Sequence, residues 1–349
     1  MDYFLLTPDF FKLLTSDDCA SNELPVPAKF CDMHAQNLSA NWILSIRNGY
    51  KIRVVFDAEN RKLVGVGDFF SDFGLVGGEV LIFESVDFEV FKVYIVGEDC
   101  SEIQYPAIVH RSQDTSPVTV SSNDGGWKFV QFISVAHPTV DTVEPPTSFM
   151  SMFGSDIPEW FVYNLKNFAL YGGHYEFLER KLSGLRKVCE GLRLLNFDVL
   201  ELMVFTYDGG RRFKLSLFDG CNVEIDLDVN DILPGSLRFR CRYPLHFKVN
   251  VHPSDMLRYC HGVTVPVEFN RVTAQWKKKD RIHVFKGALK WEFDIRKRRT
   301  GNRTSIHGGW IKFCQDLQIN VGDECYFRWI DESFHHFRVE ILKAAVPEN

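Results

Sequence analysis

The strongest constraint on the fold is a spacing pattern that occurs three times along the chain. Near the C-terminus, Phe313, Asp316 and Ile319 follow Gly309-Trp310 at three-residue steps, and the pattern ends at Gly322-Asp323. The same steps run from Gly65 to Gly78-Glu79 and from Gly184 to Phe197-Asp198. Apolar residues at i and i+3 predict a short helix with one buried stripe, followed by a tight turn into a strand. A spacing that recurs three times indicates three copies of one module.

A second pattern, Pro-x-x-Phe, lies upstream of each predicted helix. It ends at Phe30, Phe149 and Phe269, and each is preceded by an aromatic-rich strand. The segments from Phe10 to Phe30 and from Phe129 to Phe149 both span 21 residues, and the segment from Phe247 to Phe269 spans 23. Downstream of each helix, two strands with alternating apolar residues are predicted, and Asp208-Gly209-Gly210 indicates a hairpin turn between the middle pair.

These matches predict domains at 1–110, 125–230 and 245–345. Polar residues at 111–126 separate the first two copies, and a short linker around Leu233-Pro234-Gly235-Ser236 follows the second. Each copy has about 100 residues, many short strands and only two short helical segments, which favours an all-β barrel.

Several function classes find no support in the sequence. No stretch approaches the roughly 18 to 20 apolar residues that cross a bilayer, and the N-terminus lacks the basic region of a signal peptide, so we expect no membrane association. The nine cysteines form no C-x-x-C pair and no zinc-type spacing, so we expect reduced thiols, no metal and no cofactor. A glycine-rich phosphate loop and a nucleophile elbow are missing, which predicts a non-enzymatic protein without a small-molecule substrate.

The third copy resembles the plant B3 DNA-binding domain. The resemblance is carried, in order, by His252-Pro253-Ser254-Asp255, Val265-Pro266, Trp291, Ile306-His307-Gly308-Gly309-Trp310 and Gly322-Asp323. The three-copy layout, with Tyr105-Pro106 closing the first unit, is similar to the reproductive-meristem (REM) subfamily of plant transcription regulators. The resemblance implies three tandem seven-stranded open pseudobarrels, in which an N-arm and a C-arm grip the major groove of DNA. It implies no catalytic activity and no metal.

The charge is distributed unevenly among the three copies. The formal net charge of −6 combines −9 over residues 1–110, −5 over 111–238 and +8 over 239–349. A polyanion attracts the third copy and repels the first. The N-arm of the first copy, residues 15–23, has three acids and no base, which makes it a poor DNA ligand.

The candidate DNA-binding residues therefore come from the two arms of the third copy. The C-arm is expected at 296–305, with five bases in eight residues and a Gly-Asn tip. Alternation along a hairpin lets some side chains reach bases while others contact phosphates, and Arg reads guanine whereas Asn reads adenine. The predicted DNA-binding residues are His252, Ser254, Arg258, Tyr259 and His261 in the N-arm, and Arg296, Lys297, Arg298, Arg299, Asn302, Arg303 and Thr304 in the C-arm.

The sequence predicts a nuclear, sequence-specific transcription regulator that binds double-stranded DNA through its third copy. The alternative is a protein-interaction scaffold, in which the acidic first and second copies bind partner proteins and DNA binding is weak or non-specific. Other transcription factors and a second copy of the chain are candidate partners for domains 1 and 2.

Overall fold

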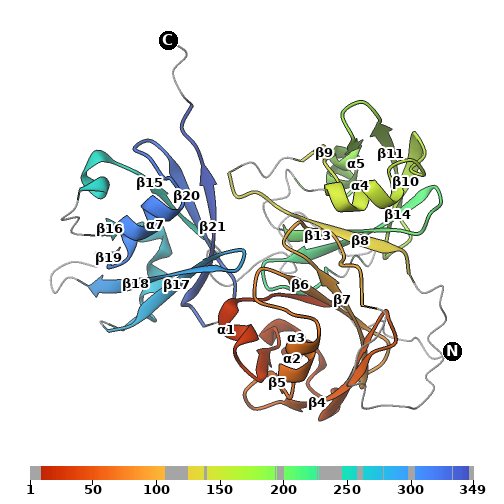
Figure 1. The fold of residues 1–349 in the computed structure, drawn as a ribbon, viewed down its shortest axis with the longest axis horizontal. Helices are drawn as coiled ribbons and strands as arrows, with labels where there is room; N and C mark the ends of the chain where they lie inside the picture. Colours follow the sequence, from red (N-terminus) through yellow and green to blue (C-terminus); the bar gives the residue numbers. More distant parts are fainter. Residues whose placement is uncertain are drawn as a thin grey trace. The chain divides into compact units, whose positions relative to one another are not determined.

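The computed structural model describes residues 9–106, 125–136, 140–192, 194, 200–225, 227, 246–257, 262–277, 279–297, 303–331 and 333–345. These residues form three seven-stranded sheets, which we call barrels 1, 2 and 3 in chain order (Figure 1). The prediction of three all-β pseudobarrels is confirmed. The predicted domain boundaries stay a prediction, because strand pairing defines the sheets and not the ends of the domains.

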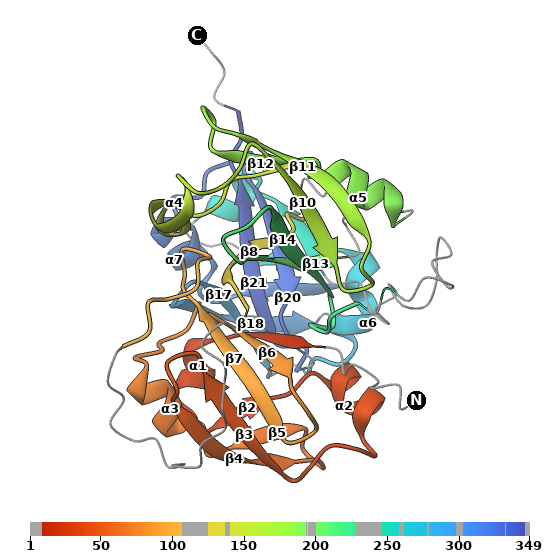
Figure 2. The same cartoon turned by 90° about the vertical axis from the view of Figure 1, so that its right-hand side faces the viewer.

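Barrel 1 contains seven strands and three short helices. In barrel 1, α2 and α3 lie at opposite sides of the curled sheet (Figure 2). Its elements are β1 (Phe10–Leu13), α1 (Ser16–Cys19), β2 (Glu23–Pro25), α2 (Ala28–His34), β3 (Asn41–Ile46), β4 (Lys51–Asp57), β5 (Lys62–Val64), α3 (Gly67–Asp72), β6 (Val80–Ser85) and β7 (Val90–Val96).

Barrel 2 repeats the order of the strands, and its helices α4 and α5 follow the second and fifth strands as α2 and α3 do in barrel 1. Its elements are β8 (Trp127–Phe132), β9 (Thr142–Val143), α4 (Thr147–Phe153), β10 (Trp160–Leu165), β11 (Leu170–Glu176), β12 (Lys181–Ser183), α5 (Leu185–Gly191), β13 (Leu200–Tyr207) and β14 (Arg212–Asp219). The turn between β13 and β14 contains Gly209 at a φ of +87°, as the Asp-Gly-Gly signal predicts.

Barrel 3 has the same order once more. Its elements are β15 (His246–Asn250), η2 (Pro253–Met256), β16 (Val263–Thr264), η3 (Val267–Phe269), α6 (Asn270–Thr273), β17 (Arg281–Lys286), β18 (Leu289–Lys297), β19 (Thr304–His307), α7 (Trp310–Asp316), β20 (Glu324–Trp329) and β21 (His336–Leu342).

The three sheets share one topology. Their strand orders are β1-β6-β7-β3-β4-β5-β2, β8-β13-β14-β10-β11-β12-β9 and β15-β20-β21-β17-β18-β19-β16. In each sheet one central pair is parallel, namely β3 with β7, β10 with β14, and β17 with β21. The register of these parallel pairs aligns the three barrels residue by residue, because Phe91, Phe213 and Phe337 lie opposite Leu44, Tyr163 and Val284.

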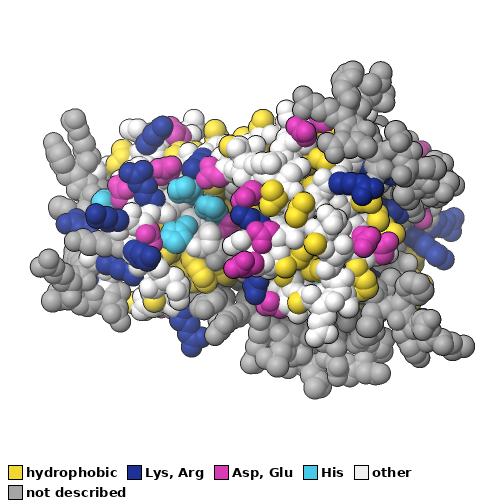
Figure 3. All heavy atoms as spheres, turned by 90° about the horizontal axis from the view of Figure 1, so that it is seen from below, with side chains coloured by type: hydrophobic (Ala, Val, Ile, Leu, Met, Phe, Trp, Pro, Cys, Tyr) yellow, Lys and Arg dark blue, Asp and Glu magenta, His cyan; other side chains and the backbone are white. Residues whose placement is uncertain are grey.

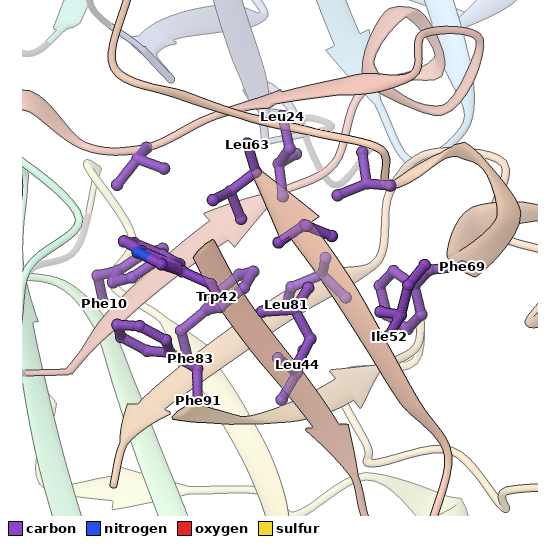
Figure 4. Packing of buried hydrophobic residues seen from close by; sticks show 14 of the residues in the cluster. Phe10, Leu24, Trp42, Leu44, Ile52, Leu63, Phe69, Leu81, Phe83 and Phe91 are labelled. Atoms are coloured by element: carbon purple, nitrogen blue, oxygen red, sulfur yellow. The ribbon is translucent and has the colours of Figure 1, made fainter. Parts of the chain in front are cut away.

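A buried aromatic trio explains the spacing of the Pro-x-x-Phe pattern. In barrel 1, Phe30 lies 4.6 Å from the ring of Phe10, which stacks on Phe83 at 4.4 Å between ring centroids. The aromatic packing continues through Trp42 and Phe91 (Figure 4). The same trio is formed by Phe129, Phe149 and Phe205 in barrel 2 and by Phe247, Phe269 and Phe327 in barrel 3. Because the phenylalanine of each pattern must reach the first strand, its distance from that strand along the chain is nearly constant.

The three-step pattern forms the predicted helix in each barrel. Its phenylalanine or valine is buried in all three, at Phe69, Val188 and Phe313. Before α7, Gly309 has a φ of +88°, and a Cβ there would lie 2.2 Å from the carbonyl oxygen of Glu292. The close approach of backbone to backbone therefore requires glycine before the tryptophan.

The described residues divide into two compact units, one made of barrels 1 and 2 and the other of barrel 3. Barrels 1 and 2 share a separate apolar core between their sheets. It consists of Phe11, Val80, Ile82, Tyr94 and Val96 from barrel 1 and Val130, Leu202, Val204 and Phe218 from barrel 2. We call this set the joint core. The first two copies therefore fold as one body.

Each barrel of this body adds a short segment to the first strand of the other. Residue Glu224 donates its backbone N–H to the carbonyl of Asp9 at 2.8 Å, and Phe10 bridges to Val223. In the reciprocal contact, Glu102 donates to the carbonyl of Lys128 at 2.9 Å, and Phe129 bridges to Ser101.

Matching ion pairs close the two ends of the joint core. Arg47 lies 2.8 Å from Glu102, and Lys166 lies 2.5 Å from Glu224. Arg47 and Lys166 each directly follow the third strand of their barrel. The body therefore has an approximate internal twofold relationship, in which equivalent residues make equivalent contacts.

No helix among the described residues is long and apolar enough to span a bilayer. None of the seven cysteines of the described ranges, which leave out Cys241 and Cys260, forms a disulfide. Burial raises the pKa of Cys325 to about 12, so this thiol is protonated and unreactive at neutral pH.

Candidate nucleic-acid interface

The C-arm of barrel 3 is the hairpin between β18 and β19. Arg296 lies opposite Ser305 and Lys297 lies opposite Thr304, which is the last described pair of the hairpin. Side chains along β18 point alternately to the core and to solvent. Ile295 is buried in the core, so the neighbouring Arg296 faces solvent.

The equivalent hairpins of the other two barrels are shorter and acidic at their base. In barrel 1, Asp57 lies opposite Lys62 in the strand register, and in barrel 2, Glu176 lies opposite Lys181. Four residues form the turn of each hairpin. By strand order and register, Asp57 and Glu176 stand where barrel 3 has Arg296. Eight residues separate Arg296 from Ser305, so the arm of barrel 3 is longer by four residues and basic at its base.

The N-arm of barrel 3 connects β15 to β16 and begins with the short helix η2. The backbone N–H of His252 donates to the Asp255 carboxylate at 2.9 Å, which caps the helix. Trp310 anchors the loop from the other side, because its indole N–H donates to the carbonyl of Asp255 at 3.0 Å. His252 and Ser254 are thereby held on the surface with their side chains exposed.

The two arms meet where β16 pairs with β19. Val263 lies opposite Ile306, and a Cβ on the preceding Gly262 would lie 2.9 Å from the carbonyl oxygen of Ile306. Ser305 and His307 lie on the outward side of β19 next to this contact, partly exposed. Both arms therefore border one continuous surface, formed by the outward side chains of β18 and β19.

The structure separates the predicted site residues into three groups. His252, Ser254, Arg296 and Arg303 are exposed and Lys297 is partly exposed. Thr304 is 5% exposed, so we assign it to the packed base of the C-arm and not to the contact surface. Arg258, Tyr259, His261, Arg298, Arg299 and Asn302 lie outside the described residues.

The basic side chains of the arms differ between the barrels, because some form ion pairs with nearby carboxylates and others do not. In barrel 1, Lys62 lies 2.9 Å from Glu23, and the hydrogen bond to Glu23 raises the pKa of Lys62. In barrel 2, Lys181 lies 3.1 Å from Glu179 and 3.5 Å from Glu144.

Barrel 3 keeps its arm bases available. Within the described part of the chain, Arg296, Lys297 and Arg303 form no ion pair. On the face drawn in Figure 3, Lys and Arg side chains gather over barrel 3, on the left, and acidic and hydrophobic side chains are prominent over barrel 1, on the right.

Sequence reasoning missed three residues that share the surface of the C-arm. Ser305 and His307 lie beside Arg296 across the β18–β19 pair, and Asp294 lies opposite His307. Asp294 is bound by Arg281 at 3.1 Å, which reduces its repulsion of an approaching phosphate. Alternation along residues 304–307 would have placed Ser305 and His307 outward.

Part of the chain is similar to known proteins. Residues 247–345 match the family model described as the B3 DNA binding domain. Among solved structures, a hypothetical Arabidopsis thaliana protein is similar at 26% identity and a TM-score of 0.23, covering 26% of this chain and 89% of that one. The Arabidopsis FUS3–DNA complex is similar at 18% identity and a TM-score of 0.24, covering 28% of this chain and 97% of that one. No curated protein matches the chain.

The matched range begins in β15 and ends just after β21, so it includes the whole sheet of barrel 3 and both of its arms. Barrels 1 and 2 repeat the same strand order outside that range. The similarity to the B3 DNA binding domain is therefore shown for the third barrel, residues 247–345.

Proposed function

We propose that the protein is a nuclear, sequence-specific transcription regulator that binds double-stranded DNA through barrel 3. The observation that carries the proposal is the C-arm, which is longer than its two counterparts and has a free base where they have an acid. The DNA lies against β18 and β19, with the C-arm and the N-arm entering the major groove.

The side chains divide by position into two roles. Arg296 and Arg303 flank the C-arm tip, where guanidinium groups can contact phosphates or guanine edges. His252 and Ser254 offer hydrogen-bond donors from the capped N-arm. Arg258, Tyr259, His261, Arg298, Arg299 and Asn302 remain proposed contacts from the sequence. With roughly 5 to 7 phosphates neutralised, the logarithm of the affinity should fall with the logarithm of salt with a slope of about −4.5 to −6.

The physics of the arm also favours DNA binding over catalysis in this barrel. Trp291 and Trp310, the most prominent aromatic residues of the B3 resemblance, are buried, and their indole N–H groups bond to Asp316 and Asp255. They hold α7 and the N-arm in place. The outward residues of the surface are bases and hydrogen-bonding groups, which suit a polyanion.

The test compares the full-length protein with the double variant Arg296→Ala/Arg303→Ala. Binding selection on random duplex DNA defines a site, and fluorescence anisotropy then measures affinity across a salt series. We expect the double variant to lose about tenfold or more in affinity and to reduce the salt slope by about 2. Lys248→Ala is the matched control, because Lys248 is already paired with Glu324 at 2.6 Å on β15 and β20.

Two results would reject the proposal. One is an unchanged affinity and salt slope in the double variant. The other is an equal loss in the Lys248→Ala control, since this would mean that total charge and not the arm governs binding.

The scaffold alternative has its own supporting observation. Barrels 1 and 2 form one body in which the arm bases Arg61, Lys62 and Lys181 are paired with acids, which makes these bases less available to a polyanion. The scaffold alternative therefore assigns to barrels 1 and 2 the binding of a partner protein.

A further inference from the structure

Barrel 1 has an open groove where its N-arm meets the start of α3. The groove has a volume of about 590 Å³. Its walls are residues 19–22 of the N-arm, Ile52 and Arg53 of β4, and Gly65, Gly67 and Asp68 at the start of α3. Pockets that bind small molecules have volumes of roughly 300 to 1,000 Å³. The groove is therefore large enough for a small ligand.

The backbone of barrel 1 is open at this place, whereas the other two barrels are closed there. In barrel 3, a Cβ on Gly309 would lie 2.2 Å from the carbonyl oxygen of Glu292, and the matching distance in barrel 2 is 2.6 Å. Gly65 has the place of Gly309 in the three-step pattern, and Arg53 has the place of Glu292 in the strand register. A Cβ on Gly65 would have no atom within 4 Å. The opening is therefore a property of barrel 1 and not of the fold.

Hydrogen bonds of Asn22 hold two walls of the groove together. Its backbone carbonyl accepts the N–H of Gly65 at 2.9 Å, and its side-chain Oδ1 accepts the N–H of Gly67 at 2.8 Å. A Cβ on Gly67 would lie 2.9 Å from this Oδ1, so a larger residue at position 67 would displace the Asn22 side chain. These bonds within barrel 1 fix the shape of the groove, and binding sites for small molecules are usually formed in advance in this way.

The N-arm side of the groove offers hydrogen-bond donors. The Oγ of Ser21 accepts the backbone N–H of Glu23 at 3.1 Å, and its hydroxyl proton can be donated to a ligand. Because the Oδ1 of Asn22 binds the backbone, the amide NH₂ group of this residue is also a donor. Two donors on one wall suit a ligand with an acceptor such as a carboxylate.

The groove is lined by one cation and one anion, Arg53 and Asp68, and both side chains are exposed. The next charged residues along the N-arm and β5, Glu23 and Lys62, pair with each other at 2.9 Å. The two charges of the lining cancel, so the groove has no excess of either sign that would attract a polyanion or a polycation. A ligand with one negative and one positive group matches both charges.

The remaining lining is apolar or uncharged. Ile52 is 3% exposed and borders the groove, and Ala20 lies on the exposed side. Burial, together with the nearby Glu79 and Asp18, raises the pKa of the Cys19 thiol to about 12, so this thiol is protonated at neutral pH. A protonated cysteine behaves as a small apolar side chain. The groove can therefore also hold an apolar group.

We propose that the groove of barrel 1 is a binding site for a free α-amino acid with an apolar side chain. The guanidinium group of Arg53 pairs with the carboxylate of the amino acid, and Asp68 pairs with its ammonium group. Ser21 and Asn22 donate further hydrogen bonds to the carboxylate. The side chain of the ligand occupies the space above Gly65. A zwitterion satisfies both charges of the lining, whereas a phosphate group would meet the Asp68 carboxylate.

The test measures binding of small molecules to the full-length protein by saturation-transfer NMR, followed by titration. The ligands are L-leucine, N-acetyl-L-leucine, which lacks the positive charge, and L-leucinamide, which lacks the negative charge. We expect leucine to bind and each derivative to bind at least about tenfold more weakly, because each loses one charge-assisted contact. No binding of leucine, and none of methionine or phenylalanine, would overturn the proposal.

Variants of the lining then locate the ligand. Arg53→Gln should weaken leucine binding by about tenfold. Asp68→Asn should weaken leucine binding but strengthen binding of N-acetyl-L-leucine, because the acid no longer repels its carboxylate. Ala20→Trp should block the groove from its exposed side. Arg61→Gln is the matched control, because Arg61 is an exposed base of the same barrel that pairs with Asp32 at 2.8 Å, and it should leave the affinity unchanged.

Thermal unfolding checks that each variant keeps the stability of the parent protein. Unchanged leucine affinity in both Arg53→Gln and Ala20→Trp would place the ligand outside the groove and reject the proposal. An equal loss in Arg61→Gln would reject it as well, since total charge would then govern binding. A preference for leucine over N-acetyl-L-leucine that survives Asp68→Asn would contradict the pairing of Asp68 with the ammonium group.

Discussion

The outward sides of the first and sixth strands differ sharply between the fused pair of barrels and barrel 3. Three equivalent positions carry Phe11, Val80 and Ile82 in barrel 1, Val130, Leu202 and Val204 in barrel 2, and Lys248, Glu324 and Tyr326 in barrel 3. The first two sets are buried in the joint core, whereas Lys248 and Glu324 form a partly exposed ion pair. Copies of one fold thus become one body or stay separate according to a few outward side chains.

The largest expected effect comes from breaking the joint core. Leu202→Ala removes a fully buried side chain from the contact between barrels 1 and 2, and we expect a loss of about 2 to 5 kcal/mol of unfolding free energy. The equivalent substitution in barrel 3, Glu324→Ala, should change stability by about 1 kcal/mol or less, because its ion pair is near the surface. Urea unfolding of the full-length variants measures both. Equal effects would mean that the joint core contributes little.

The next effect concerns the arms. Arg296→Glu gives barrel 3 the acid that barrel 2 has at the same position, and we expect DNA affinity to fall by about tenfold to a hundredfold. The reverse change, Glu176→Arg, should not bring DNA binding to barrel 2, because its turn is four residues shorter. Fluorescence anisotropy on the selected DNA site measures the effect of Arg296→Glu. The effect of Glu176→Arg is measured in the same way in a chain that also carries Arg296→Glu/Arg303→Ala, so that barrel 3 does not contribute. DNA binding gained from Glu176→Arg alone would contradict the importance of arm length.

A smaller, pH-dependent effect tests the closure of the joint core. Burial and the nearby Glu224 raise the pKa of Asp9 well above its ordinary value of 3.8. A raised carboxyl pKa means that the folded state prefers the protonated form, so Asp9 lowers stability increasingly as pH rises above about 4. Asp9→Asn should therefore stabilise the protein at pH 7, with the gain vanishing at acidic pH. Thermal unfolding from pH 3 to pH 8 follows the difference.

Glu84 provides a control of opposite sign. Although burial opposes its ionisation, Lys128 and Lys214 lower the pKa of Glu84 to about 2. Its contribution is present above the ordinary value of 4.5 and is lost as pH falls toward 2. Glu84→Gln should destabilise the protein at pH 7 and have little effect near pH 2. Parallel pH profiles for the two variants would refute the assigned pKa directions.

The smallest effect should come from the arm surface of barrel 1. Lys62→Met removes a base that is already paired with Glu23 at an exposed site. We expect a stability change below about 1 kcal/mol and no change in DNA affinity. Weaker DNA binding in this variant would show that barrel 1 takes part in DNA contact, despite its acidic surroundings.

The repeated core was predictable from the sequence, because the trio formed by Phe10, Phe30 and Phe83 follows from a spacing that is visible in all three copies. The joint core also left a signal. Residues 80–83 are apolar on both faces, whereas the equivalent residues 324–327 alternate and include Glu324. An unbroken apolar run indicates a strand that is buried on both sides.

The arm comparison required the structure. The basic run at 296–303 is evident in the sequence, but the equivalence of Arg296 with Asp57 and Glu176 depends on strand register. Burial of Thr304 follows from the same register, since its neighbour Ser305 faces outward. The groove of barrel 1 was also hidden, because its walls come from segments that lie far apart in the sequence.

The reciprocal contact between barrels 1 and 2 has a consequence for the order in which the chain is synthesised. The outer edge of β1 is paired only when residues 222–224 are available, about 120 residues after barrel 1's own last bridge at Glu102. At about 5 to 20 residues per second, that interval lasts roughly 6 to 24 seconds on the ribosome. During this time the nascent first barrel exposes an unpaired strand edge and the apolar side chains of Phe11, Val80 and Ile82. At the equivalent positions barrel 3 has the Lys248–Glu324 ion pair, so its outward face does not depend on a later segment for burial.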